Sequence, residues 1–379
     1  MLTRIALRNI FRNRRRSAIT LAVIIFGAVG LILFGGYKAV TFRGLRESTI
    51  RRIGHLQVFR AGYSSAESQK PLEYGIENAA ALRARIEKDP RVKTTAAQIT
   101  LMGLISNGDK SETFVATAVE DHADAGTVLL GTGLARSMKV REGDSITLMT
   151  TTAAGSLNAM DLRVAGTFAS GVRELDDRAV KMQLTAAQEL LQSTKIEKLL
   201  VFLHDTSQTD AARAALASKE IELKSWSELA SFYHQVVLLY NGIFSFLGLI
   251  VFGVVVFSVA NTIVMSIFER TREIGTLMAI GTARARVWRM FFLEGLLTGV
   301  IGGVLGLAFG TGLAQLINNA KFMLPPPPGY TVGYQLMILL DPRVLAITFF
   351  ISVFTATVSS IVPAFRASRM QIVDALGHI

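Results

Sequence analysis

The sequence of 379 residues contains no cysteine. A disulfide framework, thiol chemistry and a thiolate-bound metal are therefore excluded. Half of the residues are apolar and the mean hydropathy is positive, at +0.41. A disordered chain needs low hydrophobicity, so that class is excluded too, and long apolar segments are expected instead.

Sequence motifs for catalysis are also missing. No GxxxxGK[ST] phosphate-binding loop and no HExxH zinc motif occurs, and the five histidines lack the spacing of metal ligands. We therefore predict that this chain is not an enzyme and binds no cofactor or metal of its own.

Charge is almost absent from four long stretches, in which Glu294 is the only charged residue. A bilayer core about 30 Å thick needs about 20 apolar residues to cross it as a helix. We expect membrane-spanning helices at residues 17–37, 235–268, 290–320 and 344–365. The second and third exceed this length, which predicts tilt or a stalk beyond the membrane. The first is too long for a signal peptide and is interpreted as a retained anchor.

Basic residues collect in three short segments, 1–16, 269–289 and 366–379, whereas segment 38–234 is nearly neutral. Cytoplasmic segments of membrane proteins accumulate Lys and Arg. We therefore expect a multi-pass protein of the bacterial inner membrane with both termini in the cytoplasm. Membrane topology accounts for the net charge of +11, so nucleic acid is not expected as a partner. Residues 1–16, with Arg4, Arg8 and Arg12 spaced four apart, are predicted to form an interfacial helix beside anionic membrane lipids.

The predicted fold class is a membrane protein of four transmembrane α-helices with a mixed α/β periplasmic domain, residues 38–234, inserted between helices one and two. Alternating and amphipathic patterns in this segment predict several elements. The expected strands cover 55–60, 145–150, 162–168, 179–183 and 199–203, and the expected helices cover 78–88, 185–192 and 209–218. A second periplasmic loop, 321–343, contains Pro325–Pro328, which favours a stiff polyproline segment or a plain loop.

Glycine recurs every four residues in the third span. Such small residues allow close helix packing in lipid. Two stripes on one helix predict two packing partners, which are neighbouring helices of the chain or a second subunit. The stripes are Gly295, Gly299 and Gly303, and Gly302, Gly306 and Gly310.

The loop 269–289 holds a short apolar stretch, Ile274–Ile280, between charged flanks. Ile274, Leu277 and Met278 share a face of the expected helix. An exposed apolar face marks an interaction site, so we expect a partner groove or the headgroup layer to cover it.

The chain resembles the FtsX-like (MacB-type) permeases of ATP-binding-cassette systems. The resemblance rests on FERTREIGTLMAIGTARARV, on ALRNIFRNRRRS near the start and on VPAFRASR near the end, where Ile372 replaces a usual proline. It implies a coupling helix that docks into a separate ABC ATPase, present in two copies, which binds ATP and Mg. It also implies a second permease copy or paralogue. The implied coupling residues are Glu273, Ile274, Gly275, Leu277, Met278, Ile280, Gly281 and Arg284.

Within that family, Val164–Ala169 and Glu174–Asp176 resemble the lipoprotein-releasing permeases. That resemblance implies a loop at 150–161 that docks a periplasmic lipoprotein carrier, with Gly155, Ser156, Leu157 and Met160 as candidates. Three functions stay open: extraction of lipoprotein or lipid-like cargo, efflux of amphiphilic compounds through an adaptor and an outer-membrane duct, and non-transport regulation of cell-wall hydrolases. In each case the permease would transmit ATPase-driven motion to the periplasmic domain.

Overall fold

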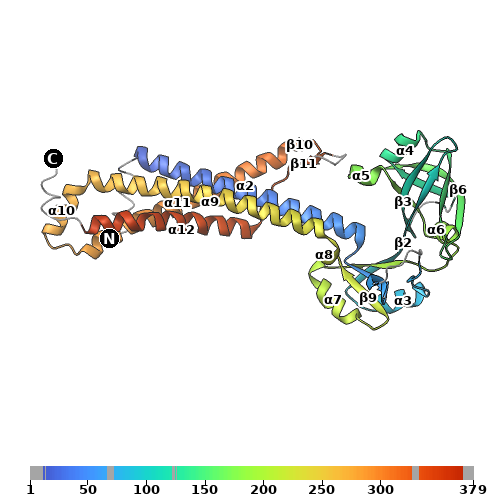
Figure 1. Ribbon diagram of the computed structural model, residues 1–379. Coiled ribbons are helices and arrows are strands. Elements are labelled where there is room, and N and C mark those ends of the chain that lie inside the picture. The colour runs from blue at the N-terminus through green and yellow to red at the C-terminus, as the bar shows by residue number, and fades with distance from the viewer. Residues whose placement is uncertain are drawn as a thin grey trace. The chain divides into compact units, whose positions relative to one another are not determined.

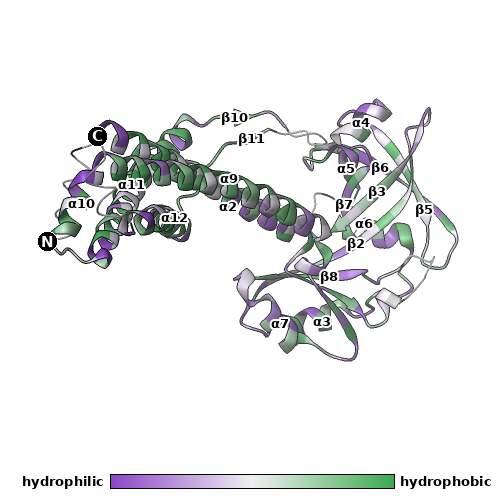
Figure 2. Ribbon diagram, turned by 60° about the vertical axis from the view of Figure 1, so that its left-hand side comes forward, coloured by the Kyte–Doolittle hydropathy of each residue, from purple (hydrophilic) through white to green (hydrophobic). Residues whose placement is uncertain are grey.

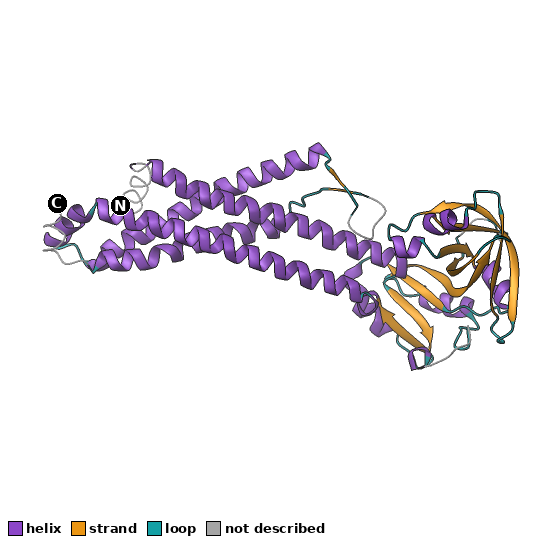
Figure 3. Cartoon of the chain, turned by 45° about the horizontal axis from the view of Figure 1, so that its top comes forward, coloured by secondary structure: helices purple, strands orange, loops and turns teal. Residues whose placement is uncertain are grey.

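The computed structural model describes residues 12, 14–65, 72–121, 124, 126–326 and 333–369. The chain divides into two compact units (Figure 1). Unit 1 comprises residues 1–44, 235–323 and 335–379, and unit 2 comprises residues 45–234 and 324–334. Figure 3 shows that unit 1 is helical and that unit 2 holds the main sheet.

Four helices long and apolar enough to cross a membrane are present in the described residues. They are α2 (Arg14–Ile53), α9 (Ser231–Glu269), α11 (Arg284–Ala320) and α12 (Pro342–Ser368). Figure 2 shows hydrophobic residues along most of their length. Large apolar side chains such as Phe26, Phe257 and Phe350 are exposed. Water would penalise this surface, whereas acyl chains solvate it, so the prediction of four apolar helices is confirmed.

The helix ends differ from the expected spans. α2 continues past Tyr37 to Ile53, and the boundary between the units falls inside it, after Gly44. Charged residues such as Arg43 end the stretch that lipid can solvate, but they do not end a helix. Most of the predicted interfacial helix, residues 370–379 of the tail, and Pro327 and Pro328 of the proline run lie outside the described residues.

The two glycine stripes of α11 face two different helices of unit 1. A Cβ on Gly295 or Gly299 would lie 2.4 Å from Ser360 or 2.9 Å from Ala356 of α12. On the second stripe, a Cβ on Gly306 would lie 2.5 Å from the Cβ of Ala28 on α2. Gly302 and Gly310 likewise approach Ile24 and Ile32 of α2, and Gly303 approaches Phe349 of α12. Both stripes are thus covered by the chain's own helices, and α11 lies between α2 and α12.

Unit 2 is built on a nine-stranded mixed sheet within the described residues, in the order β3-β7-β4-β6-β5-β2-β8-β1-β9. The strands are β1 (Leu56–Arg60), β2 (Val92–Ser106), β3 (Ser111–Val119), β4 (Thr127–Gly131), β5 (Ser145–Thr151), β6 (Leu157–Phe168), β7 (Ala179–Gln183), β8 (Lys198–Leu203) and β9 (Ile221–Ser225). The mixed α/β prediction is confirmed. β2, β3, β4 and β9 were not expected.

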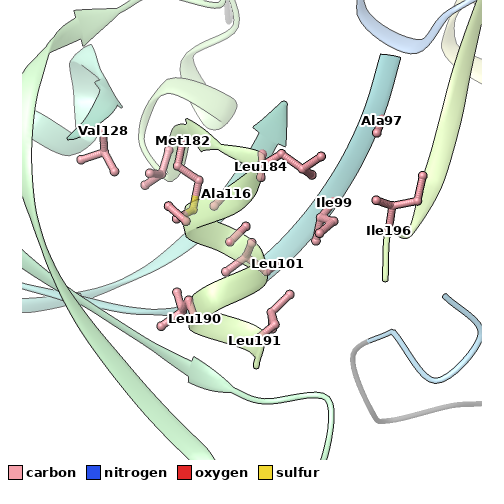
Figure 4. Packing of buried hydrophobic residues seen from close by; sticks show 14 of the residues in the cluster. Ala97, Ile99, Leu101, Ala116, Val128, Met182, Leu184, Leu190, Leu191 and Ile196 are labelled. Carbon is pink, nitrogen blue, oxygen red and sulfur yellow. The ribbon is translucent and has the colours of Figure 1, made fainter. Parts of the chain in front are cut away.

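Short helices connect these strands. They are α3 (Ala79–Ile86), α4 (Thr132–Met138), α5 (Arg173–Asp176), α6 (Leu184–Leu191), α7 (Thr209–Leu216) and α8 (Trp226–Leu229), with single 3-10 turns at Tyr63–Ser65 and Thr206–Gln208. Figure 4 shows Leu190 and Leu191 on different sides of α6, with Leu191 on the side of β2, which carries Ile99 and Leu101; all four residues are buried. Between α11 and α12, β10 (Met323–Leu324) pairs with β11 (Tyr334–Gln335).

His55 closes the turn between α2 and β1. The chain turns at Gly54, whose φ of +73° favours glycine. The buried His55 ring accepts a hydrogen bond at Nδ1 from the Leu203 backbone N–H (3.0 Å) and contacts Thr206 Oγ1 through Nε2 (3.1 Å). An accepting Nδ1 requires the neutral ring. Burial lowers the pKa of His55, and the nearby Asp205 carboxylate opposes this effect.

We predict that unit 2 loses stability as the pH falls below about 6.5, because the unfolded histidine takes up a proton before the folded one does. The contribution of the neutral His55 ring to stability is fully present above that pH. It is lost as the pH falls toward the lowered pKa of His55 in the folded state. Trp226 fluorescence during thermal unfolding of the full chain at pH 8 to 5 measures it, with Trp288, the other tryptophan, replaced by Phe in both proteins. His55→Asn keeps an acceptor for Leu203 but cannot titrate, so its melting temperature should depend less on pH; parallel curves for the two proteins would refute the assignment.

We also predict that Gly306→Val destabilises the bundle by about 1–3 kcal/mol, because the added carbons collide with Ala28. Gly312→Val on the same helix is the matched control, since a Cβ there meets nothing within 4 Å in the described part of the chain. Thermal unfolding in detergent should separate the two variants. Equal melting temperatures would show that α2 and α11 do not pack closely at Gly306.

Candidate coupling site

The apolar stretch of the loop between α9 and α11 forms a helix, α10 (Thr271–Ala279). The Thr271 hydroxyl donates to the carbonyl of Ile267 (3.0 Å), which joins the start of α10 to the end of α9. At the other end Gly281 has φ +95°, and the Gly281 and Thr282 N–H groups donate to the carbonyls of Met278 and Leu277. A left-handed glycine with such bonds is a common helix ending. Only a few residues remain to connect α10 to α11.

The two faces of α10 have different surroundings. Ile274 (1% exposed) and Met278 (8%) are buried in an apolar cluster with Ile267, Val287 and Phe291 of the neighbouring helices. The expectation of one exposed apolar face is therefore wrong for these two residues. They lie one turn apart and pack on the chain's own helices, and Gly275 beside them is also buried.

The outward face of α10 carries the exposed part of the predicted set. Leu277 is 40% exposed and Ile280 is 76% exposed, and Glu273, Gly281 and Arg284 are exposed as well. A partner could contact these side chains without disturbing the buried cluster. Sequence reasoning placed Leu277 on the same face as Met278, but the helix turns it outward.

Ion pairs connect the start of α2 to this region. Arg12 lies 3.3 Å from Glu273, and Arg16 pairs with Glu269. Arg270 Nε donates to Glu273 at 3.0 Å. This hydrogen bond is the main reason why the pKa of Glu273 is lowered, with the charges of Arg270 and Arg12 adding to it. Because these pairs are exposed, each adds little stability, but together they fix which way Glu273 points. Sequence reasoning did not identify Arg12 or Arg16 as members of this site.

The predicted carrier-docking loop has a different form from the one expected. Residues 150–161 belong to a β-hairpin in which β5 and β6 pair from Ser145↔Arg163 to Thr151↔Leu157. Gly155 (φ +94°) and Ser156 form its tight end, and Leu157 on β6 is 74% exposed. Met160 instead packs partly against the core of unit 2. The loop was expected from the resemblance to the lipoprotein-releasing permeases.

Three further exposed apolar residues lie beside Leu157. The strand registers Leu104↔Met149 and Thr151↔Leu157 place Met102, Leu104, Met149 and Leu157 on one face of β2, β5 and β6. All four are exposed within unit 2. No sequence signal identified this face, because residues 101–105 (LMGLI) contain no polar residue that would mark an alternation.

An apolar groove of about 390 Å³ lies between α2, α9 and α12. Its walls include Gly27 and Leu31 of α2, Gly248 and Phe252 of α9, and Thr355 of α12. Among the described residues, no charged side chain lines it. This volume is in the range of pockets that hold small ligands, and its apolar walls suit a hydrocarbon chain.

In the described part of the chain, no group of three or more His, Cys, Asp or Glu side chains could hold a metal ion.

Comparison with known proteins defines the family. Residues 17–219, more than half of the chain, match the family model of the MacB-like periplasmic core domain, and residues 245–372 match that of the FtsX-like permease C-terminal region. The chain belongs to the FtsX-like, MacB-type permease family. The first match covers α2 and most of unit 2, and the second covers α10, α11 and α12.

Relatives of this permease include proteins of two kinds. The macrolide export ATP-binding/permease protein MacB of Salmonella paratyphi A is 33% identical over 132 residues, which are 35% of this chain and 18% of that protein. The lipoprotein-releasing system transmembrane protein LolE of Haemophilus influenzae is 22% identical over 271 residues, 64% of this chain and 65% of that protein. The permease thus aligns with less than a fifth of the MacB relative.

Among solved structures, the periplasmic region of MacB from Actinobacillus actinomycetemcomitans matches with a TM-score of 0.33 and 12% identity. That match covers 49% of this chain and 95% of the other.

We predict that Leu277→Asp abolishes co-purification of the ABC ATPase that the family resemblance implies as a partner, while membrane insertion and thermal stability stay near wild type. Leu277 is exposed on α10, so the new carboxylate stays hydrated in the free permease and would be buried only in a docked complex, where burial of the charge is costly. Leu277→Met is the matched control and should retain the ATPase. Ile274→Asp should instead lower the melting temperature of the permease itself, since Ile274 is buried. If Leu277→Asp still retained the ATPase, this face of α10 would not be the docking surface.

Proposed function

We propose that this permease is the membrane subunit of an ABC transporter whose ATP hydrolysis takes place in a separate partner. In this proposal the permease acts as a pair of identical or related chains. Two ATPase copies dock on this pair from the cytoplasmic side, and the docking surface is the outward face of α10. ATP and Mg are bound by the partner, and unit 2 is the periplasmic domain. Both termini then lie in the cytoplasm.

The observation that carries the proposal is the two-faced construction of α10. Its inward face is fixed to α9 and α11 through Ile274 and Met278, so α10 cannot shift without moving the helices it packs on. Its outward face leaves Leu277 and Ile280 exposed. A force applied there would pass into the bundle. The boundaries between the units fall inside α2 and near the start of α9, so these helices are the covalent route from unit 1 to unit 2.

For the cargo we propose a lipoprotein or another lipid-like molecule. The apolar groove between α2, α9 and α12 supports this, because it offers a hydrocarbon chain a wall without charge. The similarity to LolE over most of the chain supports it as well. The exposed patch of Met102, Leu104, Met149 and Leu157 would be the place where a periplasmic carrier docks, since exposed apolar patches mark interaction sites.

Efflux of amphiphilic compounds through an adaptor and an outer-membrane duct is the second candidate. The observation that favours it is the higher identity to MacB, although over a shorter segment. Depletion of the permease in its own cells separates the two. Lipoproteins retained in the inner membrane would support extraction, whereas normal sorting with new sensitivity to amphiphilic drugs would support efflux.

We predict that Gly248→Phe stops release of cargo while ATPase binding and basal ATP hydrolysis continue. Gly248 lines the groove, and a side chain there has space to enter it, because its Cβ would meet nothing within 4 Å in the described residues. Gly253→Phe is the matched control on the same helix, equally open and outside the groove. Release of lipoprotein from proteoliposomes measures the effect. Equal release by both variants would mean that cargo does not use the groove.

A further inference from the structure

One lysine lies among aromatic side chains between α2 and α9 in unit 1 (Figure 1). Lys38 Nζ of α2 is 5.5 Å from the ring centre of Phe42 and 5.8 Å from that of Phe244 on α9. The Tyr240 ring contacts both of these rings, at 6.1 and 5.8 Å between centroids, and its side chain is hydrogen-bonded to that of Tyr37. We call Tyr37, Phe42, Tyr240 and Phe244 the aromatic cluster.

The aromatic cluster lies about one bilayer thickness away from the coupling site. Arg16 of α2 pairs with Glu269 beside α10, and α2 rises by about 33 Å from Arg16 to Lys38. The hydrocarbon core of a bilayer is about 30 Å thick. Tyrosine and lysine are typical of the boundary between hydrocarbon and headgroups. The aromatic cluster is therefore at headgroup level, in the leaflet opposite to the coupling site.

No acid of α2 or α9 neutralises Lys38, because residues 17–46 and 231–268 contain no Asp or Glu. Asp341 at the start of α12 caps its own helix by accepting from the Arg343 N–H (2.8 Å), and it forms no ion pair with Lys38 in the described chain. Aromatic faces attract a cation but carry no net charge. The ammonium group also has three N–H donors to satisfy. Lys38 is thus suited to an anionic ligand whose oxygens accept hydrogen bonds.

The apolar groove of unit 1 continues from the same helix faces. Lys38 follows Leu31 of the groove by seven residues, which places it on the same side of α2 and about 10 Å farther along. On α9, Phe244 precedes Gly248 of the groove by one turn. The rings of Phe34 and Phe244, 6.0 Å apart, lie between the two regions. A ligand with its anionic group at Lys38 can therefore extend an apolar tail into the groove.

A glycerophospholipid has both parts of such a ligand. Its phosphate lies at headgroup level and its acyl chains point toward the middle of the bilayer, so it would need no reorientation to enter this site. Phosphate oxygens form strong hydrogen bonds with an ammonium group. A zwitterionic lipid would bring a second cation close to Lys38, whereas a lipid of net negative charge would not. The charge of the site thus favours an anionic lipid.

From these contacts we propose that Lys38, the aromatic cluster and the groove form a binding site for an anionic glycerophospholipid, such as phosphatidylglycerol. Its phosphate accepts hydrogen bonds from Lys38, and one acyl chain lies in the groove between α2, α9 and α12. In the orientation of the proposed function this lipid comes from the outer leaflet. The inference rests on that function only in sharing the groove, where the phospholipid is the occupant that a cargo chain has to displace.

Native mass spectrometry of the full-length permease in detergent tests the site. Phosphatidylglycerol should bind more tightly than phosphatidylethanolamine with the same acyl chains. Lys38→Gln should weaken phosphatidylglycerol binding about fivefold, which is the effect of one lysine beside an anionic lipid surface, and should leave phosphatidylethanolamine binding nearly unchanged. Arg43→Gln is the matched control, because it removes the same charge from another, exposed face of α2. Equal binding of the two lipids to wild type, or equal loss in the two variants, would overturn the proposal.

Two further comparisons separate the headgroup from the acyl chain. Glycerophosphoglycerol, the headgroup without chains, should not displace phosphatidylglycerol at millimolar concentration; displacement would show a site for soluble phosphate compounds and contradict a lipid site. Gly248→Phe fills the groove and should weaken phosphatidylglycerol binding, whereas Gly253→Phe should not. Wild-type binding by Gly248→Phe would show that no acyl chain enters the groove, and the proposed site would be wrong.

The same variants keep this inference distinct from the cargo proposal. If Gly248→Phe stops lipoprotein release while Lys38→Gln binds phosphatidylglycerol like wild type, the phospholipid site is refuted and the cargo proposal stands. If Lys38→Gln and Gly248→Phe both lose phosphatidylglycerol while lipoprotein release continues, the phospholipid site stands and the groove is not the path of the cargo.

Discussion

Close approach of backbones along α11 is the constraint on which the membrane unit depends. Between apolar helices in lipid there is no hydrophobic driving force, so they are held together by close packing and by polar contacts. Gly302 and Gly306 bring α11 against α2, and Gly295 and Gly299 bring it against α12. The helices approach so closely at these glycines that a residue with a Cβ atom would collide with the neighbouring helix. These contacts fix three of the four long helices to one another. α9 contributes fewer buried residues and presents a broad apolar surface.

The α10 helix takes its orientation from that bundle. A short amphipathic helix in water would be marginal by itself. Here the burial of Ile274 and Met278, the hydrogen bond from Thr271 and the glycine ending at Gly281 hold it in a defined orientation. The arginines at the start of α2 then set the charged edge of the site through Glu269 and Glu273. A rigid projection of this kind can receive a push, whereas a flexible loop would absorb it.

Much of the fold was predictable because its determinants are periodic. The four apolar helices followed from uncharged runs of bilayer length, and β7 and α7 followed from local alternation and amphipathicity. β2 and β3 were missed although they form a local hairpin that turns at Asn107 and Gly108. The distant partners β8 and β7, which pair with β2 and β3, could not be identified from local pattern. The extension of α2 to Ile53 was missed because charged residues were taken to end the helix.

The candidate site was predictable in its location but not in its orientation. The charged flanks and the glycines marked residues 269–284 in the sequence. Which of Ile274, Leu277 and Met278 face inward depends on where α9 and α11 lie, and no local pattern encodes that.

Cysteine cross-linking tests most directly whether the outward face of α10 is the surface on which the ATPase acts. A single cysteine in place of Ile280, in a chain that otherwise has none, should form a cross-link to the ATPase in the assembled complex, and the yield should change when ATP is bound. A cysteine in place of the buried Met278 should form none. If Ile280→Cys gave no cross-link in a complex that hydrolyses ATP, the ATPase would act on another part of the permease and the account of α10 would be contradicted.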